Sequence, residues 1–263
     1  MIKDPAFWST IIAVVALILS QLPPVSELLK PKKLRIVVPD NLSLQHYMGN
    51  LQLLAFLALH NVGGRGITVQ RIQCVMRDED GHQWELPGQT YQPRAEKGVP
   101  ELVIGWITLK PSEHWAETVR FFKVWSVQDE EDATAISARI RNEITAKLAL
   151  RGPDESNKLV EASDNTVKEA IDFFAKRFTL AKGNYRLFIA ALTEENAVVC
   201  VRAFDFTLFD HQLRALRSAA DDYKMGAGIY FQNPDPLKYG AFIRLRPIAD
   251  TEAQKDYARL RIL

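Results

Sequence analysis

Cysteine is scarce in this chain, and that scarcity limits the kinds of protein the chain can be. Its 263 residues include only two cysteines, Cys74 and Cys200. Two thiols are too few for a disulfide framework or for a cysteine-based zinc site. Each lies in an apolar, strand-like run, so we expect both to be buried and reduced, as in a cytoplasmic protein. The alternative is one bridge across a β-sandwich, which would require an oxidising compartment.

Motifs of catalysis are also missing. None of the histidines has the H-x-x-x-H, H-x-H or H-E-x-x-H spacing of metal sites, and no G-x-S-x-G sequence occurs. The glycines at 63, 64 and 66 lack the spacing of phosphate-binding loops and indicate a turn. The carboxylates at 78–80 precede Gly81 between two strand-like runs, which favours a hairpin turn over a Ca²⁺ site. We therefore expect no enzyme activity, no cofactor and no metal. An active site assembled from residues scattered along the chain is the alternative.

A surplus of positive charge is absent as well. The chain has 33 Lys and Arg against 32 Asp and Glu, a net charge of +1. Domains that bind nucleic acids usually carry a basic excess, so we expect no nucleic-acid partner. The hydrophobic fraction of 47% is ordinary for a globular domain and is sufficient for a sizeable core.

What the chain does contain is a long apolar run at its N-terminus. A helix needs about 20 apolar residues to cross a hydrocarbon core of about 30 Å, and the apolar zone runs from residue 6 toward residue 25. We predict a short tail over residues 1–5 and a transmembrane anchor over residues 6–25. The anchor side chains are Phe7, Trp8, Ile11, Ile12, Val14, Val15, Leu17, Ile18 and Leu19.

Two other interpretations of this run are disfavoured. A cleaved signal peptide would have a basic start and a small-x-small cleavage site, whereas the chain has only Lys3 before the run and Gln-Leu-Pro-Pro after it. A buried helix that is apolar on every side would need a large core around a chain terminus.

A basic segment follows the apolar run. Lys30, Lys32, Lys33 and Arg35 lie there, in and beside a predicted juxtamembrane linker over residues 26–33. Because cations are enriched on the cytoplasmic side of membrane segments, we expect the C-terminal domain in the cytoplasm. The same cations could lie against anionic headgroups, which attract each cation by about 1 kcal/mol.

Short strand-like runs separated by turn signals dominate residues 34–263. Leu51–Leu59 is apolar at both parities, which predicts a central strand covered on both faces. In Thr68–Asp78 the residues Ile72, Cys74 and Met76 alternate with polar ones, which predicts a strand with one buried face. Further strands are expected at 34–38, 82–86, 102–109, 118–127, 185–192, 197–209, 226–231 and 239–248. Without βαβ alternation, this pattern predicts an antiparallel β-sandwich.

Helical periodicity interrupts the strands at about 129–182. Ile136, Ile140 and Ile144 recur at every fourth position, and a second stripe ends at Phe174 and Phe178, so we expect an inserted pair of helices. The adjacent Phe173 and Phe174 cannot both be buried fully against one surface. Phe173 or Phe178 is therefore a candidate partner surface; the alternative is that both reach the core. Short helices are also expected at 210–223 and 252–259.

One five-residue stretch resembles immunoglobulin-like sandwiches. Gly183-Asn184-Tyr185-Arg186-Leu187 is similar to the G-x-Y-x-L sequence that opens a late strand in many of them. The resemblance implies that the hydroxyl of Tyr185 bonds a backbone group at a corner of the sandwich.

The sequence thus predicts a mainly β protein: an antiparallel, immunoglobulin-like β-sandwich with an inserted helical pair, preceded by one transmembrane helix. We expect a membrane-anchored adaptor or assembly subunit whose partners are the lipid bilayer and another protein. The alternatives are the same fold facing the periplasm, as a binding or assembly protein of the envelope, and an enzyme with a non-local site.

Overall fold

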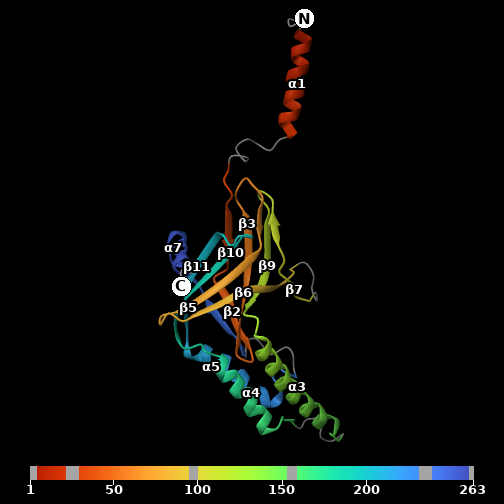
Figure 1. Ribbon diagram of the computed structural model, residues 1–263, viewed down its shortest axis with the longest axis vertical. Helices are drawn as coiled ribbons and strands as arrows, with labels where there is room; N and C mark the ends of the chain where they lie inside the picture. Colours follow the sequence, from red (N-terminus) through yellow and green to blue (C-terminus); the bar gives the residue numbers. More distant parts are fainter. Residues whose placement is uncertain (1–4, 22–29, 95–99, 153–158, 231–238, 261–263) are drawn as a thin grey trace.

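The fold is mainly antiparallel β, as the sequence predicts. The computed structural model describes residues 5–21, 30–94, 100–152, 159–230 and 239–260. Within them eleven strands form one sheet, and a further pair forms a separate ribbon (Figure 1). The large sheet contains β1 (Leu34–Val37), β2 (Asn41–Tyr47), β3 (Asn50–Asn61), β5 (Arg71–Asp78), β6 (Gln83–Gln92), β7 (Leu102–Val103), β9 (His114–Phe122), β10 (Gly183–Leu192), β11 (Val198–Leu208), β12 (Ala241–Arg244) and β13 (Arg246–Pro247); the ribbon pairs β4 (Ile67–Val69) with β8 (Ile107–Leu109).

Strand β6 joins the two halves of the sheet. The strand order is β12-β2-β3-β9-β6-β5-β10-β11-β13, with β1 also on β3 and β7 also on β6. Residues 83–87 of β6 pair with β5, and its residues from Gly88 to Gln92 pair with β9 across a register shift. Such an irregularity bends a strand and increases its twist. The sheet curls until β1 and β12 contact β11, so it is nearly closed, which is consistent with a sandwich whose layers share β6.

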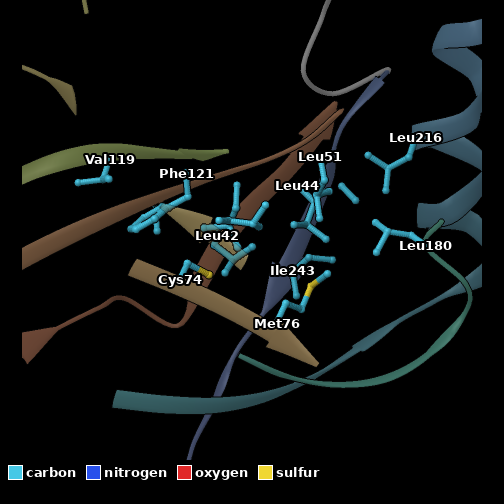
Figure 2. Close-up of a cluster of buried hydrophobic side chains, with 14 of the residues drawn as sticks. Leu42, Leu44, Leu51, Cys74, Met76, Val119, Phe121, Leu180, Leu216 and Ile243 are labelled. Atoms are coloured by element: carbon cyan, nitrogen blue, oxygen red, sulfur yellow. The ribbon is translucent and has the colours of Figure 1, made fainter. Parts of the chain in front are cut away.

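The core lies between these two halves. Figure 2 shows side chains from β2, β5, β9 and β12 converging there, with Leu180 and Leu216 at the end nearest the helices. Phe121, Leu44, Leu53 and Met76 are completely or almost completely buried. Burial of apolar surface on this scale is the main stabilising contribution to such a fold.

The predicted alternation of buried side chains is confirmed in β5 and revised in β3. Ile72, Cys74 and Met76 are all buried in the core, although the predicted strand divides at Gln70 into β4 and β5. In β3 every second residue is buried, whereas residues such as Leu54 and Phe56 on the other face are half-buried. The prediction that both faces of this strand are covered is therefore wrong.

Tyr185 makes the backbone contact that its sequence context implies. Its hydroxyl donates to the carbonyl oxygen of Ala181 at 2.6 Å and accepts from the amide of the same residue at 3.1 Å. Burial raises the pKa of this hydroxyl, which keeps it protonated and able to donate. These two hydrogen bonds hold Ala181, which precedes β10, against Tyr185 within that strand.

Five α-helices occur in the described residues, and three of them lie at one end of the sheet (Figure 1). The predicted helical pair is confirmed, because α3 (Val127–Ala149) and α4 (Asp164–Arg177) pack on each other. Ile136, Ile140 and Ile144 form the buried stripe of α3, as expected. Helix α5 (Asp210–Asp221) also lies there, followed by the 3-10 turn η2 (Asp222–Met225), while α1 (Pro5–Gln21) stands at the opposite end (Figure 1).

Helix α7 (Asp250–Leu260) covers the outer face of β10 and β11. Its Ala253 and Tyr257 pack on Phe188 in a second, smaller apolar cluster. Arg186 of β10 pairs with Asp205 of β11 at 3.0 Å and also with Asp256 of α7. This helix therefore closes one outer face of the sheet with both apolar and ionic contacts.

The predicted strand at 226–231 is wrong within its described residues. Gly226 and Gly228 have φ angles of +80° and +70°, a left-handed conformation that turns the chain instead of extending it. Residue 231 lies outside the described residues. The predicted strand at 239–248 is divided into β12 and β13 at Leu245, whose amide donates to Asp40 at 2.7 Å.

The predicted transmembrane helix is not supported. The apolar run does form a helix, but α1 has 17 residues, which rise about 26 Å at about 1.5 Å each against a hydrocarbon core of about 30 Å. Among the described residues, no helix combines the length and the apolar character needed to cross a bilayer. Residues 1–4 of the predicted tail, 22–25 of the predicted anchor and 26–29 of the predicted linker lie outside the described part of the chain.

Both cysteines are free thiols, which agrees with the expectation of reduced side chains over the expectation of a bridge. Cys74 is buried and Cys200 is half-buried. Burial raises the pKa of each thiol and so disfavours the reactive thiolate.

The turn between β2 and β3 provides a test of how closely the sheet and the inserted helices fit. Gly49 and Gly81 both have positive φ, +91° and +89°. A methyl group at Gly49 would lie 2.8 Å from the carbonyl oxygen of Phe174, whereas one at Gly81 would approach nothing closer than 3.5 Å. We expect Gly81→Ala to lower the free energy of unfolding by about 1–2 kcal/mol. Gly49→Ala should cost roughly 1–3 kcal/mol more, because its methyl group also overlaps α4.

Urea unfolding of both variants measures this difference. Equal losses for the two variants would show that the turn and α4 are not in close contact.

Candidate functional site

Helices α4 and α5 meet the sheet at a half-buried histidine. His46 of β2 bonds the carbonyl oxygen of Leu216 in α5 through Nε2 at 2.7 Å, and its Nδ1 accepts from the amide of Gly49 at 3.2 Å. This pattern requires the neutral tautomer with its proton on Nε2. The rings of Phe174 and Phe178 pack on the imidazole, with centroids 4.9 and 5.3 Å away. Burial lowers the pKa of His46 to about 4.

Beside this junction a groove separates the end of the sheet from the helices, and we call it the insert groove. Its volume is about 810 Å³, the size of a small-molecule or peptide-side-chain site. It is lined by Gly49, Asn50, Leu51, Gln83, Trp84, Glu85, Leu86, Pro87, Lys123, Val124, Trp125, Ser126, Asp129, Arg177, Phe178, Thr179 and Leu180.

One wall of the insert groove is an aromatic and ionic stack. The guanidinium of Arg177 lies 3.4 Å from the ring centre of Phe173 and pairs with Asp129 at the start of α3. This hydrogen bond from Arg177 is the main cause that lowers the pKa of the Asp129 carboxyl. The ring of Trp125 meets Phe173 edge-on at 5.8 Å. Because the guanidinium of Arg177 already contacts both the carboxylate of Asp129 and the ring of Phe173, this wall of the groove is pre-organised.

The opposite wall carries a second tryptophan. The indole nitrogen of Trp84 donates to the hydroxyl of Thr179 at 3.0 Å, which ties β6 to the segment after α4. Two aliphatic side chains lie near Trp125: Val124, which lines the groove and is 59% exposed, and Val127, at the start of α3, which is 78% exposed. Aliphatic side chains this exposed are available to an apolar partner.

The lining of the insert groove engages several of its own polar side chains. It includes neither histidine nor cysteine in the part of the chain that the structure describes. Its Ser126 hydroxyl accepts from the amide of Asp129 at 3.1 Å as the cap of α3, and Thr179 is engaged by Trp84. The Ser126 hydroxyl also bonds the Asp129 carboxylate, which in turn pairs with Arg177.

The structure buries both phenylalanines that the sequence marks as a candidate partner surface. Phe173 is 6% exposed and Phe178 is 8% exposed. Arg177 and Trp125 contact the ring of Phe173, and His46 and Phe174 contact the ring of Phe178. This is the alternative in which both rings reach the core.

The predicted anchor residues are exposed on all sides of α1. Every described side chain from Phe7 to Leu17 is exposed, including Trp8, Ile11, Ile12, Val14 and Val15, while the side chains of Ile18 and Leu19 lie outside the description. The juxtamembrane cations Lys30, Lys32, Lys33 and Arg35 are exposed too.

Two further clusters have structural explanations. Asp78, Asp80 and His82 bring their ligand atoms within 4.8 Å of one another, but the Asp78 carboxylate accepts from the backbone and ring of His82 at 2.8 and 3.0 Å. This closes the predicted hairpin turn. A cavity of about 500 Å³ beside Arg186 is lined by the ion pairs that hold α7.

Two of the histidines lie beside each other. His60 and His114 are register neighbours on β3 and β9, with ring centres 6.5 Å apart. His114 lines a cavity with Glu113, whereas His60 is not part of that lining.

Sequence reasoning missed the residues that form the insert groove. Trp84 lies on β6 and Trp125 in the segment between β9 and α3, and only the curl of the sheet brings them to the same groove. His46 lies in an ordinary alternating stretch with no local signal of burial. Only the three-dimensional structure identifies these residues.

Comparison with known proteins adds no assignment: no protein family, curated protein or solved structure matches this chain.

The half-buried His46 makes stability depend on pH. The pKa of His46 is lowered to about 4 in the folded protein, so between its unfolded value near 6.5 and pH 4 the unfolded chain binds more protons. Stability from this group is therefore complete above pH 6.5 and is lost as the pH falls toward 4, by on the order of 3 kcal/mol in total.

Chemical unfolding of the wild type and His46→Gln across this pH range isolates the effect, because the carboxylates common to both proteins cancel. The advantage of the wild type should shrink as the pH falls. A constant difference between the two proteins would contradict a His46 that stays neutral in the folded protein.

Proposed function

We propose that this protein is a membrane-attached binding protein without enzymatic activity, an adaptor or assembly subunit. The observation that carries the proposal is the all-round exposure of α1. The helix has no charged residue, and Phe7, Ile12, Val14 and Leu17, at different angles around its axis, are each at least half exposed. Such a helix requires an apolar environment outside the domain.

Lipid accounts for this exposure better than a protein partner does. A partner helix or groove typically covers one apolar stripe and leaves the remaining face polar. Helix α1 has its polar residues, Ser9, Thr10, Ser20 and Gln21, near its two ends and apolar residues on every side between them. Lipid surrounds a helix on all sides and tolerates polar groups best near the ends of an apolar segment.

The cytoplasmic side is the favoured location of the domain. The four cations after α1 suit the cytoplasmic leaflet, whose anionic lipids attract basic segments. The alternative, an envelope-facing domain of the same fold, predicts that proteases digest the domain in intact right-side-out spheroplasts, whereas a cytoplasmic domain is protected.

The second part of the proposal is that the insert groove binds an apolar segment of a partner protein. Tryptophan and arginine are the residues that most often dominate binding energy in protein interfaces, and the groove presents Trp84, Trp125 and Arg177. The exposed Val124 adds apolar surface within the groove, and the exposed Val127 extends that surface beyond it. The arrangement suits an uncharged, apolar side chain, because Arg177 and Asp129 already neutralise each other.

Membrane attachment is tested by flotation of the full-length protein with phosphatidylcholine vesicles. We expect the wild type to float. Ile12→Lys/Val15→Lys should abolish flotation, because each lysine at the centre of an apolar helix costs about 2.5–3.5 kcal/mol.

Ser9→Lys/Ser20→Lys adds the same charge near the helix ends, so it should still float. A wild type that remains at the bottom of the gradient would contradict the proposed attachment.

Partner binding is tested by a photo-crosslinking amino acid at position 127 in cells. We expect a discrete adduct whose partner can be identified by mass spectrometry. The adduct should be lost with Trp125→Ala, which removes the adjacent wall of the groove.

The same crosslinker at the exposed Lys168 on α4 serves as the control and should give no such adduct. Identical adducts at both positions, or none at position 127, would contradict a binding site at the insert groove.

A further inference from the structure

The end of the domain nearest α1 is a rigid platform built from three separated segments. Residues 30–35, 60–66 and 109–114 meet there, and Asn61 joins them from a completely buried position. Its side-chain amide donates to the carbonyl oxygens of Arg65 at 2.8 Å and Leu109 at 3.0 Å. Its side-chain oxygen accepts from the amide of Gly63 at 3.0 Å. The loops are thus held in one conformation.

The segment that arrives from α1 packs directly on this platform. The amide of Val62 donates to the carbonyl oxygen of Lys33 at 2.9 Å. A methyl group at Gly63 would lie 2.3 Å from the carbonyl oxygen of Pro31, so only glycine permits this approach. In Figure 1 α1 lies beyond the end of the domain that is opposite α3, α4 and α5.

The platform is strongly basic in a chain that is nearly neutral. Its three segments contain six Lys and Arg residues and one acid, a net charge of +5, and since the whole chain carries +1 the remainder carries −4. The acid is Glu113, whose carboxylate accepts from the backbone amide of Lys110 at 2.7 Å. The cations of the platform are Lys30, Lys32, Lys33, Arg35, Arg65 and Lys110, all exposed.

We infer that this end of the domain, which we call the basic platform, rests on anionic phospholipid headgroups. The inference builds on the proposed attachment of α1 to lipid and adds a second contact made by the folded domain. Arg65 and Lys110 belong to loops far from α1 in the sequence, yet they lie beside the segment that leads to it. The charge asymmetry turns the basic platform toward a negatively charged surface and the opposite end away from it.

The platform constrains how the domain sits on the membrane. Because the loops are held by Asn61, they present their cations without the loss of backbone freedom that a mobile basic tail incurs on binding. The contact therefore fixes one end of the domain against the lipid surface and leaves the insert groove at the other end open to the solvent.

The test compares partition of the full-length protein onto phosphatidylcholine vesicles and onto vesicles that also contain phosphatidylglycerol. We expect tighter binding to the anionic vesicles. Arg65→Glu/Lys110→Glu should weaken that binding by roughly 25-fold or more, because each cation near such a surface contributes about fivefold. It should leave binding to phosphatidylcholine unchanged. Lys168→Glu/Lys176→Glu changes the net charge equally on exposed positions of α4 and should have little effect.

The outcomes separate this inference from the proposed attachment. No binding of the wild type to either vesicle would overturn the attachment by α1. Equal binding to both vesicles, or equal losses for the two charge-reversed variants, would overturn the basic platform and leave the attachment standing. Arg65→Gln/Lys110→Gln removes the two charges without reversing them, and thermal unfolding checks that this variant is folded. If charge and not misfolding is responsible, it should also bind the anionic vesicles more weakly than the variant with changes on α4 does.

Discussion

The contact between His46 and the turn at Gly49 is the constraint on which the functional end of this molecule depends. The imidazole bonds α5 through one nitrogen and the β2–β3 turn through the other, while α4 packs on its face. A charged histidine could not accept from Gly49, and a side chain at Gly49 would overlap α4. One neutral ring and one glycine therefore set the spacing between sheet and helices, and with it the width of the insert groove.

The two ends of the domain differ in chemistry because they are built from different elements, helices at one end and short loops at the other. The helical end is assembled from aromatic rings whose polar partners are supplied internally, as with Arg177 and Asp129. The other end is assembled from short loops whose backbone groups are satisfied by Asn61, so its charged side chains point outward. An internal partner makes one end suitable for apolar ligands, and a surplus of exposed cations makes the other suitable for anions.

Much of the architecture could be predicted from the sequence, because its elements have strong local signals. The i+4 recurrence of Ile136, Ile140 and Ile144 defines α3, and the G-x-Y-x-L stretch predicts the backbone contact of Tyr185. Where local pattern and conformation conflict, prediction failed: the apolar residues near Gly226 resemble a strand, but the left-handed φ of that glycine turns the chain. The groove was not predictable, since Trp84 and Trp125 line the same groove only when β6 bends and the sheet curls.

Strand β3 links the two ends of the domain directly. Its first residue, Asn50, lines the insert groove, and its last, Asn61, holds the basic loops. Twelve residues of extended chain span about 40 Å, with hydrogen-bonded neighbours on both sides. Strand β3 therefore sets the distance between the insert groove and any surface that the loops contact. Because backbone geometry fixes this distance, it would change only if residues were added to or removed from the strand.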